Sequence, residues 1–415
     1  MQQHGISKLD LKRQNRMQVL KILKQQGPTS RIDIANMLEL TRAAVTIITN
    51  EMISQGVIHE IGEFQNISEK AQRGRKKILI DINQNYKFVL GVLIDKDIIS
   101  VGLSTLAGAV LDKRNLYIKS DIAYKEILDF ITESINSILT DNCLHLDEIL
   151  GIGFGVFPGM YQNAEVEISD KGEPNFTHLA VDVYEKFKVP LIFDNSVKGT
   201  AMANIDFQPT KDVNRHNIAF LRYGDSLHFV VTNLNEPIIS YDNRTDFVDK
   251  IIVDPTSNGK DELSNVGSVK EELSRLGVKK KIANVYSKEK TPKLFELTDG
   301  DFNKVNYETI RAAALNGDQL VNEIVVKALK LGAVLLNNLY YSTNPQRIVL
   351  HNLRVNEEEF KYLKREVAKI AGESVASKID LSIIDKNHGF LSGCAIAIRE
   401  LFFTRGGFDT VENVQ

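Results

Sequence analysis

Residues 89–113 have the sequence VLGVLIDKDIISVGLSTLAGAVLDK, which is three apolar runs separated by two short polar turns. This spacing predicts three antiparallel strands. Residues 217–240, NIAFLRYGDSLHFVVTNLNEPIIS, repeat the same pattern. In each half of the chain, helices that alternate with buried strands follow these hairpins. Two copies of this unit, in which hairpins are followed by alternating helices and strands, predict an α/β protein of two lobes with a cleft between them.

The composition is that of a globular protein with large cores. The chain has 415 residues, 43% of them hydrophobic, which is enough for two or three domains. Its two cysteines, Cys143 and Cys394, are too few for a disulfide framework or a four-ligand zinc site. No segment is apolar enough to span a membrane, and residues 1–14 lack the apolar core of a signal peptide. We therefore expect a cytoplasmic protein without a membrane partner.

The first 82 residues differ in charge from the rest. They contain 13 Lys and Arg against 8 Asp and Glu, a net charge of +5, whereas the whole chain carries −3 and the remainder therefore −8. This asymmetry indicates a basic module on an acidic body.

The basic module has the pattern of a helix-turn-helix. Residues 12–26 place apolar side chains at helical spacing, and the sequence QGPTS ends that segment. Ser30 can cap a second short helix, and Thr41 can cap a third, which Gly56 ends. Three short helices with a tight turn before the third are typical of this motif.

The third helix has two distinct faces at 3.6 residues per turn. Val45, Ile48 and Met52 fall on one stripe and are expected to pack inward. A polar face, suited to reading DNA, consists of Arg42, Thr46, Thr49 and Asn50.

Two strands after this helix predict a β-hairpin wing. They cover residues 57–64 and 76–83, and the basic sequence RGRKK, residues 73–77, lies where the loop between them returns into the second strand. Arginines in such a loop suit phosphates or a narrow minor groove. The residues expected to bind DNA are Arg31, Thr41, Arg42, Ala43, Thr46, Gly74, Arg75 and Lys76. The alternative is a basic helical domain that docks to protein.

Motifs in both parts resemble the ROK family of repressors and sugar kinases. The head is similar through GPTSRIDIANMLELTRAAVT and GRKKILIDIN, and the body through GIGFGVFPG, PNFTHL, PLIFDNSVKGTAMAN, NPQRIVL and GFLSGCAIAI. The resemblance implies an N-terminal winged helix-turn-helix followed by a two-lobed actin-like ATPase and sugar-kinase (ribonuclease H-like) fold. It also implies a homodimer or tetramer, a DNA operator, and a sugar or sugar phosphate as effector.

The kinase elements of the family are replaced in this chain. Leu93 stands at the aspartate of the first phosphate turn, and residues 95–97, Asp-Lys-Asp, replace its Gly-Gly-Thr. The second turn keeps only Gly224, and the third reads HNL at residues 351–353. Two carboxylates repel a triphosphate, and the lost glycines prevent close backbone approach. We therefore expect no nucleotide cofactor.

The zinc signature of the family is also replaced. The positions that align with its ligands are occupied by Asp261, Leu263, Ser268, Lys270 and Lys250. A tetrahedral zinc site needs thiolates or imidazoles, so we expect no metal.

The sugar site of the family is partly retained. Ser196 replaces the catalytic aspartate next to Asn195, and serine cannot act as the general base of phosphoryl transfer near neutral pH. The residues expected to bind ligand are Gly159, Asn175, Asn195, Ser196 and Lys250. Lys250, in combination with Lys198 or Arg222, can attract an anionic group such as a sugar phosphate, although a neutral sugar such as xylose stays open. The alternative is structural: Ser196 caps a helix, Asn195 satisfies loop carbonyls and the lysines are solvated.

These patterns predict three domains and a regulatory function. They are the winged helix at 1–82, a first lobe at 83–205 joined by a C-terminal helix at 388–404, and a second lobe for effector and dimerisation at 206–387. The function expected is a DNA-binding repressor of carbohydrate-utilisation genes without enzymatic activity. The alternatives are a carbohydrate kinase, or a ligand-independent regulator whose body serves only for dimerisation.

Overall fold

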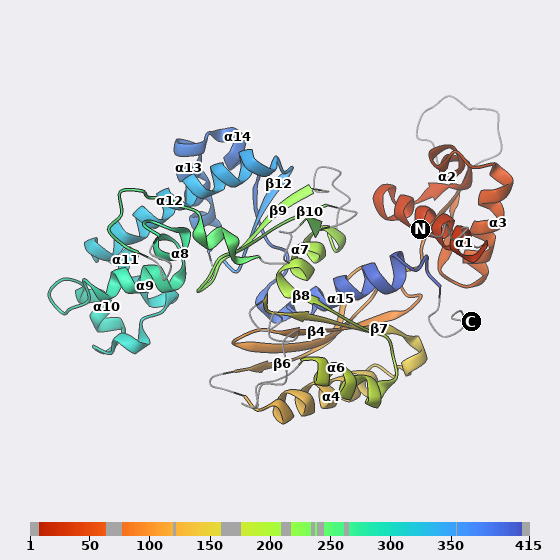
Figure 1. Cartoon of the computed structure of the whole chain (residues 1–415), viewed down its shortest axis with the longest axis horizontal. Coiled ribbons are helices and arrows are strands. Elements are labelled where there is room, and N and C mark those ends of the chain that lie inside the picture. Colours follow the sequence, from red (N-terminus) through yellow and green to blue (C-terminus); the bar gives the residue numbers. More distant parts are fainter. Residues whose placement is uncertain are drawn as a thin grey trace, which may run out of the picture. The chain divides into compact units, whose positions relative to one another are not determined.

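The computed structural model describes residues 8–63, 77–118, 122–158, 176–208, 217–233, 237–238, 245–260, 265–353 and 355–408. The chain divides into two compact units, one of residues 1–213 with 386–415 and one of residues 214–385 (Figure 1). The domain limits expected at residues 82, 205 and 387 stay predictions. Five expected site residues lie outside the described residues, namely Gly74, Arg75, Lys76, Gly159 and Asn175.

The head, residues 8–82 of the first unit, contains three helices and an antiparallel sheet in the order β1-β3-β2. Its elements are α1 (Lys8–Gln26), β1 (Thr29–Ser30), α2 (Arg31–Leu38), α3 (Arg42–Ser54), β2 (Ile58–Glu63) and β3 (Ile78–Ile82). Ser30 and Thr41 cap α2 and α3, as their spacing predicts, and Glu39 ends α2 in the left-handed conformation at φ 55°. The predicted winged helix-turn-helix is confirmed.

The first lobe, the rest of the first unit, is built on a five-stranded sheet in the order β6-β5-β4-β7-β8. Its strands are β4 (Phe88–Ile94), β5 (Ile98–Ser104), β6 (Val110–Tyr117), β7 (Ile149–Val156) and β8 (Leu191–Asn195). The hairpins β4-β5-β6 are antiparallel, whereas β4, β7 and β8 run parallel. Strand β7 follows the short 3₁₀ turn η1 (Leu146–Glu148).

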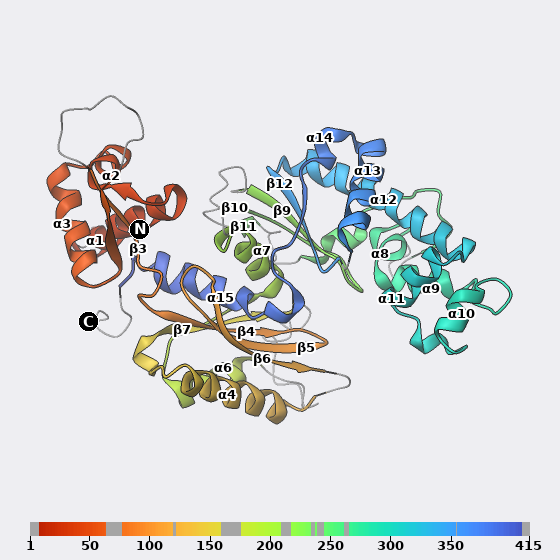
Figure 2. The same cartoon turned by 180° about the vertical axis from the view of Figure 1, so that it is seen from behind.

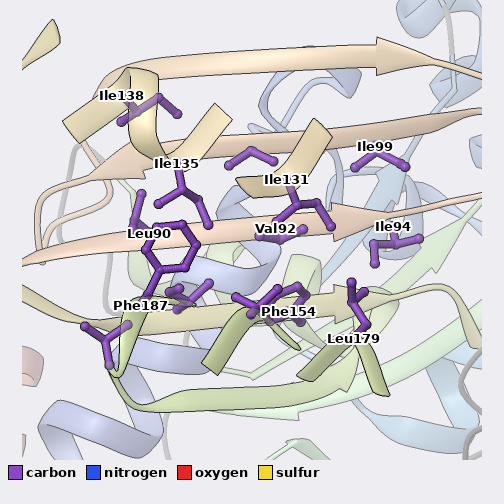
Figure 3. Close-up of a cluster of buried hydrophobic side chains, with 14 of the residues drawn as sticks. Leu90, Val92, Ile94, Ile99, Ile131, Ile135, Ile138, Phe154, Leu179 and Phe187 are labelled. Carbon is purple, nitrogen blue, oxygen red and sulfur yellow. The ribbon is translucent and has the colours of Figure 1, made fainter. Parts of the chain in front are cut away.

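Helices cover both faces of this sheet. Helices α4 (Tyr124–Asp141) and α6 (Phe176–Phe187) lie on one face, while α7 (Ser196–Asp206) and α15 (Leu391–Ala397) lie on the other (Figure 1). A 3₁₀ turn, η6 (Lys386–His388), precedes α15, and a π-helical turn, η7 (Ile398–Phe403), extends it. Figure 3 shows the core beneath α4 and α6, in which Leu90 and Phe154 of the sheet meet Ile131 and Ile135 of α4.

Helix α15 approaches β7 so closely that only glycines fit. A Cβ added to Gly153 would lie 1.9 Å from the carbonyl oxygen of Gly393, and one added to Gly393 would lie 2.1 Å from that of Gly153. The sequence GIGFG of β7 and the small residues of α15 therefore allow the last helix to pack against the central strands.

The second unit is built on a sheet with the same strand order, β11-β10-β9-β12-β13. Its strands are β9 (Asn217–Arg222), β10 (His228–Asn233), β11 (Pro237–Ile238), β12 (Arg347–His351) and β13 (Ile379–Leu381). As in the first lobe, the hairpins are antiparallel, and the first strand runs parallel to the last two. The predicted duplicated α/β fold is confirmed.

The helices of the second unit gather beside this sheet (Figure 2). They are α8 (Val269–Glu272), α9 (Arg275–Ala283), α10 (Pro292–Leu297), α11 (Tyr307–Leu315), α12 (Gln319–Thr343), α13 (Glu357–Ala371) and α14 (Glu373–Ala376), with the 3₁₀ turns η4 (Asp246–Lys250) and η5 (Phe302–Lys304). The sequence predicted α12 and α13 but not α8 to α11, because those helices are too short for a clear apolar period. Within the described parts of the chain, no helix combines the length and apolarity that a membrane span requires.

Two helical glycines allow a matched test of close packing. Gly393→Ala should lower the free energy of unfolding by about 1–3 kcal/mol, because the new methyl group collides with backbone. The same change at Gly332 in α12, where no heavy atom lies within 4 Å of an added Cβ, should raise it by about 0.5–1 kcal/mol. Urea unfolding of both variants measures this difference, and equal effects would contradict the close approach of α15 to β7.

Candidate DNA-binding and effector sites

One face of helix α3 is exposed to solvent. Arg42, Thr46 and Asn50 are exposed on it, as predicted from the helical period, and so is Ala43, which was also expected to bind DNA. Val45 and Met52 are fully buried on the opposite face. Thr49 was expected on the polar face, but this is wrong, since Thr49 is fully buried. Its hydroxyl donates to the carbonyl oxygen of Val45 (2.8 Å), and an internal hydrogen bond of this kind makes a polar side chain compatible with burial.

Ile47 is a candidate contact that the polar pattern missed. Its side chain lies on the exposed face of α3 and is 69% exposed. An apolar residue at this place is suited to the methyl group of thymine in the major groove. In the sequence, Ile47 is an apolar residue next to Thr46. Only its exposure in the structure distinguishes it from Ile48, which is half-buried.

Arg31, expected to contact DNA, is held by three neighbours within the head. Its guanidinium donates to Thr49 Oγ1 (3.0 Å) and Asn50 Oδ1 (3.1 Å), and pairs with Glu60 Oε1 (2.8 Å). Arg31 therefore braces α3 against α2 and the wing strand β2. These contacts favour a role for Arg31 in orienting the exposed face of α3 over a direct contact with DNA.

Two other residues near this face are committed to local contacts. Thr41 Oγ1 accepts from the backbone N–H of Ala44 (3.2 Å), so Thr41 acts as the N-cap. Lys77, at the return of the wing, pairs with Asp33 Oδ1 (2.8 Å) and, with Ser30, holds the pKa of Asp33 below its usual range.

Arg16 of α1 joins the head to the C-terminal turn of the chain. Its side chain is 1% exposed. Its Nε donates to the carbonyl oxygen of Gly406 (2.8 Å) and an Nη to that of Gly407 (3.2 Å). The other Nη donates to Gln55 Oε1 (2.6 Å) and Glu51 Oε1 (3.2 Å), at the end of α3. Burial lowers the pKa of Arg16, and Glu51 opposes that shift.

A second cluster of charges joins α1 to the same C-terminal segment. Asp206 Oδ1 lies 2.8 Å from Lys24 Nζ, and Asp206 Oδ2 accepts from Arg399 Nε (2.7 Å). Burial raises the pKa of Asp206, but Arg399 and Lys24 outweigh it and hold that pKa below its usual range. Helix α1 is thus bound to residues 399–407 at two places.

Asn195 and Ser196 lie at the junction of β8 and α7. The structural alternative assigned the N-cap to Ser196, but this is wrong: Asn195 is the cap, and its Oδ1 accepts from the N–H of Val197 (2.8 Å). Ser196 is the first residue of α7, and both side chains are buried. Lys198 pairs with Asp194 (2.5 Å), so this lysine is partnered within the junction.

Lys250 and Phe247 lie on the 3₁₀ turn η4 of the second unit, and both are exposed. Between them, Asp249 is buried and accepts from the N–H of Leu227 (2.8 Å) and from Ser226 Oγ. Burial raises the pKa of Asp249 despite these hydrogen bonds. The buried carboxylate anchors η4 to the turn between β9 and β10, and Lys250 is exposed beside it.

The replaced kinase turn is occupied by its own carboxylate. Asp95 is buried at the β4-β5 turn, and its Oδ1 accepts from the N–H of Lys96 (2.8 Å). A phosphate oxygen would need that N–H, so this backbone donor is already used. His351, in the third replaced turn, is half-buried, and desolvation of its imidazole together with the charge of Arg222 lowers its pKa to about 3.

No protein-family model matches the chain. The xylose repressor of Caldicellulosiruptor bescii is 26% identical over 46% of this chain and 47% of its own length. The DNA-binding transcriptional dual regulator NagC of Escherichia coli is 23% identical over 84% of this chain and 82% of that protein. The chain thus spans about half the length of the xylose repressors that it matches.

Solved structures share the fold. A ROK family transcriptional regulator, a homologue of the E. coli MLC protein, matches with a TM-score of 0.70 at 18% identity, over 95% of this chain and 98% of that one. The ROK hexokinase of Thermus thermophilus matches with a TM-score of 0.58 at 13% identity, over 76% of this chain and 99% of that one. These similarities confirm the resemblance to ROK regulators with a sugar-kinase fold.

Replacing Arg16 tests the junction between the head and the C-terminal turn. Arg16→Ala should lower the free energy of unfolding by about 2–4 kcal/mol, because two carbonyl oxygens and Glu51 lose a buried partner. Arg13→Ala, on the same helix with a side chain 52% exposed, should change it by less than about 0.5 kcal/mol. Thermal and urea unfolding measure both, and a tolerated Arg16→Ala would rule out the junction as a stabilising contact.

Proposed function

We propose that this chain is a DNA-binding transcriptional regulator that represses carbohydrate-utilisation genes and responds to a sugar or sugar phosphate. The observation that carries the proposal is the exposed face of α3 in a winged helix-turn-helix, on a head more basic than the body. The names of the relatives, xylose repressor and NagC, support the same function.

Helix α3 is the proposed reading element. Its N-terminal residues would contact base edges in the major groove, as the second helix of this motif does. Thr46 and Asn50 supply hydrogen-bonding groups, and Ile47 supplies an apolar contact. The basic wing loop, with Gly74, Arg75 and Lys76, would contact phosphates or the minor groove. A homodimer or tetramer would place two heads on half-sites about one or two helical turns apart.

The proposed effector contacts are Asn195, Ser196 and Lys250, together with Gly159 and Asn175. Asn195 uses its Oδ1 as a helix cap, which leaves its amide N–H groups as donors for a hydroxyl. The exposed Lys250 favours an anionic effector such as a sugar phosphate. The absence of a carboxylate at Ser196 supports binding without phosphoryl transfer.

Arg42→Ala should weaken binding to an operator fragment about tenfold and lower the slope of log affinity against log salt by about 1, because a phosphate contact is lost. The matched control is Arg365→Ala, an exposed arginine of the second unit that should leave both quantities unchanged. Fluorescence anisotropy at several salt concentrations measures them. Unchanged binding by the Arg42 variant would refute α3 as the reading element.

A panel of neutral sugars and sugar phosphates should contain a ligand that raises the melting temperature, since a ligand at 100 times its Kd adds about 2.7 kcal/mol to the folded state. If the effector is a sugar phosphate, Lys250→Ala should weaken it about tenfold because a charge-assisted contact is lost. Lys288→Ala, an exposed lysine of the same unit, should leave its affinity unchanged. ATP with magnesium should give no shift, and turnover of ATP with any sugar would contradict the proposal.

A further inference from the structure

The second unit contains a cavity of about 830 Å³ that no predicted site residue lines. It lies at the carboxyl ends of the parallel strands β9 and β12, where Leu221 and Leu350 line it. Helices α9, α11, α12 and α13 supply most of the remaining lining residues. The volume is within the range of sites for small organic ligands, and such sites are common at this edge of α/β sheets.

The wall of the cavity is mainly aliphatic. Two apolar clusters of the second unit border it, represented by Leu336 and Leu363 on one side and Ile310 on the other. Leu315 and Leu276 also line it, and their side chains are 72% and 48% exposed. Aliphatic surface that remains in contact with water favours an apolar occupant, because covering it removes that surface from water.

Gly332 of α12 keeps part of this space open. It lies in the interior of a 25-residue helix, where glycine is less favourable than alanine. The close backbone contact that explains Gly393 is absent here, since no heavy atom lies within 4 Å of a Cβ added to Gly332. The absence of a side chain at Gly332 therefore leaves part of the cavity volume unoccupied.

Arg275, the first residue of α9, supplies a polar end. Its Nε is buried without a hydrogen-bond partner, and one Nη reaches the carbonyl oxygen of Asn352 only at 3.5 Å. Its guanidinium lies 5.6 Å from the ring centroid of Tyr223. Burial raises the pKa of Tyr223 to about 12, so the hydroxyl keeps its proton and can donate. Among the described residues, no carboxylate pairs with Arg275, whereas Arg311 of the same cavity pairs with Glu359.

The charges of the lining argue against a polyanion. The cationic residues are Arg275, Lys279 and Arg311, and the acidic residues are Asp225, Glu308, Glu358 and Glu359. The lining thus carries one more acidic than basic residue, and a triphosphate or a sugar bisphosphate would meet several times the repulsion that a single carboxylate meets. A guanidinium binds a carboxylate through two parallel hydrogen bonds, which would satisfy the unpaired Nε.

We propose that this cavity is a binding site for an amphipathic carboxylic acid. Its aliphatic or aromatic body fills the apolar space beside Gly332, and its carboxylate pairs with Arg275 and accepts from the hydroxyl of Tyr223. This ligand is additional to the sugar effector, and the site does not depend on the function proposed for the head.

The test uses decanoate and the neutral 1-decanol as probes of the full chain, by isothermal titration calorimetry below the micellar concentration. Decanoate should bind at one site per chain. Arg275→Gln should weaken decanoate about tenfold but 1-decanol less than about threefold, because only the acid loses a charged partner. Lys280→Gln, an exposed position of the same helix, should change neither. No binding of decanoate, or equal losses for both probes in Arg275→Gln, would overturn the proposal.

Filling the cavity locates the site. Gly332→Leu should abolish binding of both probes, whereas Gly332→Ala should leave measurable affinity. Undiminished binding of decanoate by Gly332→Leu would place the site elsewhere and overturn the proposal. The proposal would also be overturned if the unmodified chain did not bind decanoate and Gly332→Leu lost self-association. The cavity would then hold part of a second copy of the chain. If Gly332→Leu does not fold, a crystal structure of the unmodified chain with decanoate decides: the acid must lie against Arg275.

Discussion

The buried guanidinium of Arg16 is the interaction on which the first unit depends. Residues 390 positions apart meet there, because Arg16 of α1 donates to the carbonyl oxygens of Gly406 and Gly407. A buried guanidinium must have its N–H groups satisfied, so the turn, α1 and the end of α3 are held together. Both glycines have φ of +68°, which other residues rarely adopt, and the turn that faces Arg16 therefore requires them. The orientation of the head is thus coupled to the last residues of the fold.

The same C-terminal segment completes the first lobe. Helix α15 packs against β7 through facing glycines, and the turn η7 that follows carries Arg399 to the carboxylate of Asp206. A sheet built from residues 88–195 is therefore covered by a helix that begins about 200 residues later in the chain, at Leu391. The second unit is inserted between them, with its own sheet in the same strand order and its own core. Each lobe buries its apolar faces independently, which explains why the duplicated pattern was visible in the sequence.

Sequence reasoning predicted most elements of the head and both sheets, because caps, turns and apolar periods are local properties. Its predictions were wrong where the burial or hydrogen bonding of a polar side chain depends on residues that are distant in the sequence. Thr49 lies within about 20° of a polar stripe by period but is buried, since Arg31 bonds to its hydroxyl. At the junction of β8 and α7, Asn195 and not Ser196 is the N-cap, because Asn195 Oδ1 accepts from the N–H of Val197 and Ser196 is already the first residue of the helix. Lys198 is engaged by Asp194, whereas Lys250 remains exposed.

The sequence by itself determined the fold class and the basic head, and it is the basis of the expectation that the chain lacks kinase activity. Each depends on which residues stand at consecutive or periodic positions, such as Leu93 and Ser196 at the places of family aspartates. Only the tertiary structure decided which polar groups are paired, as at Arg16, and where space is left, as beside Gly332 and Arg275. Pairing and cavities depend on distances between residues that are remote in the chain. Those distances follow from packing of the whole unit, which no local pattern encodes.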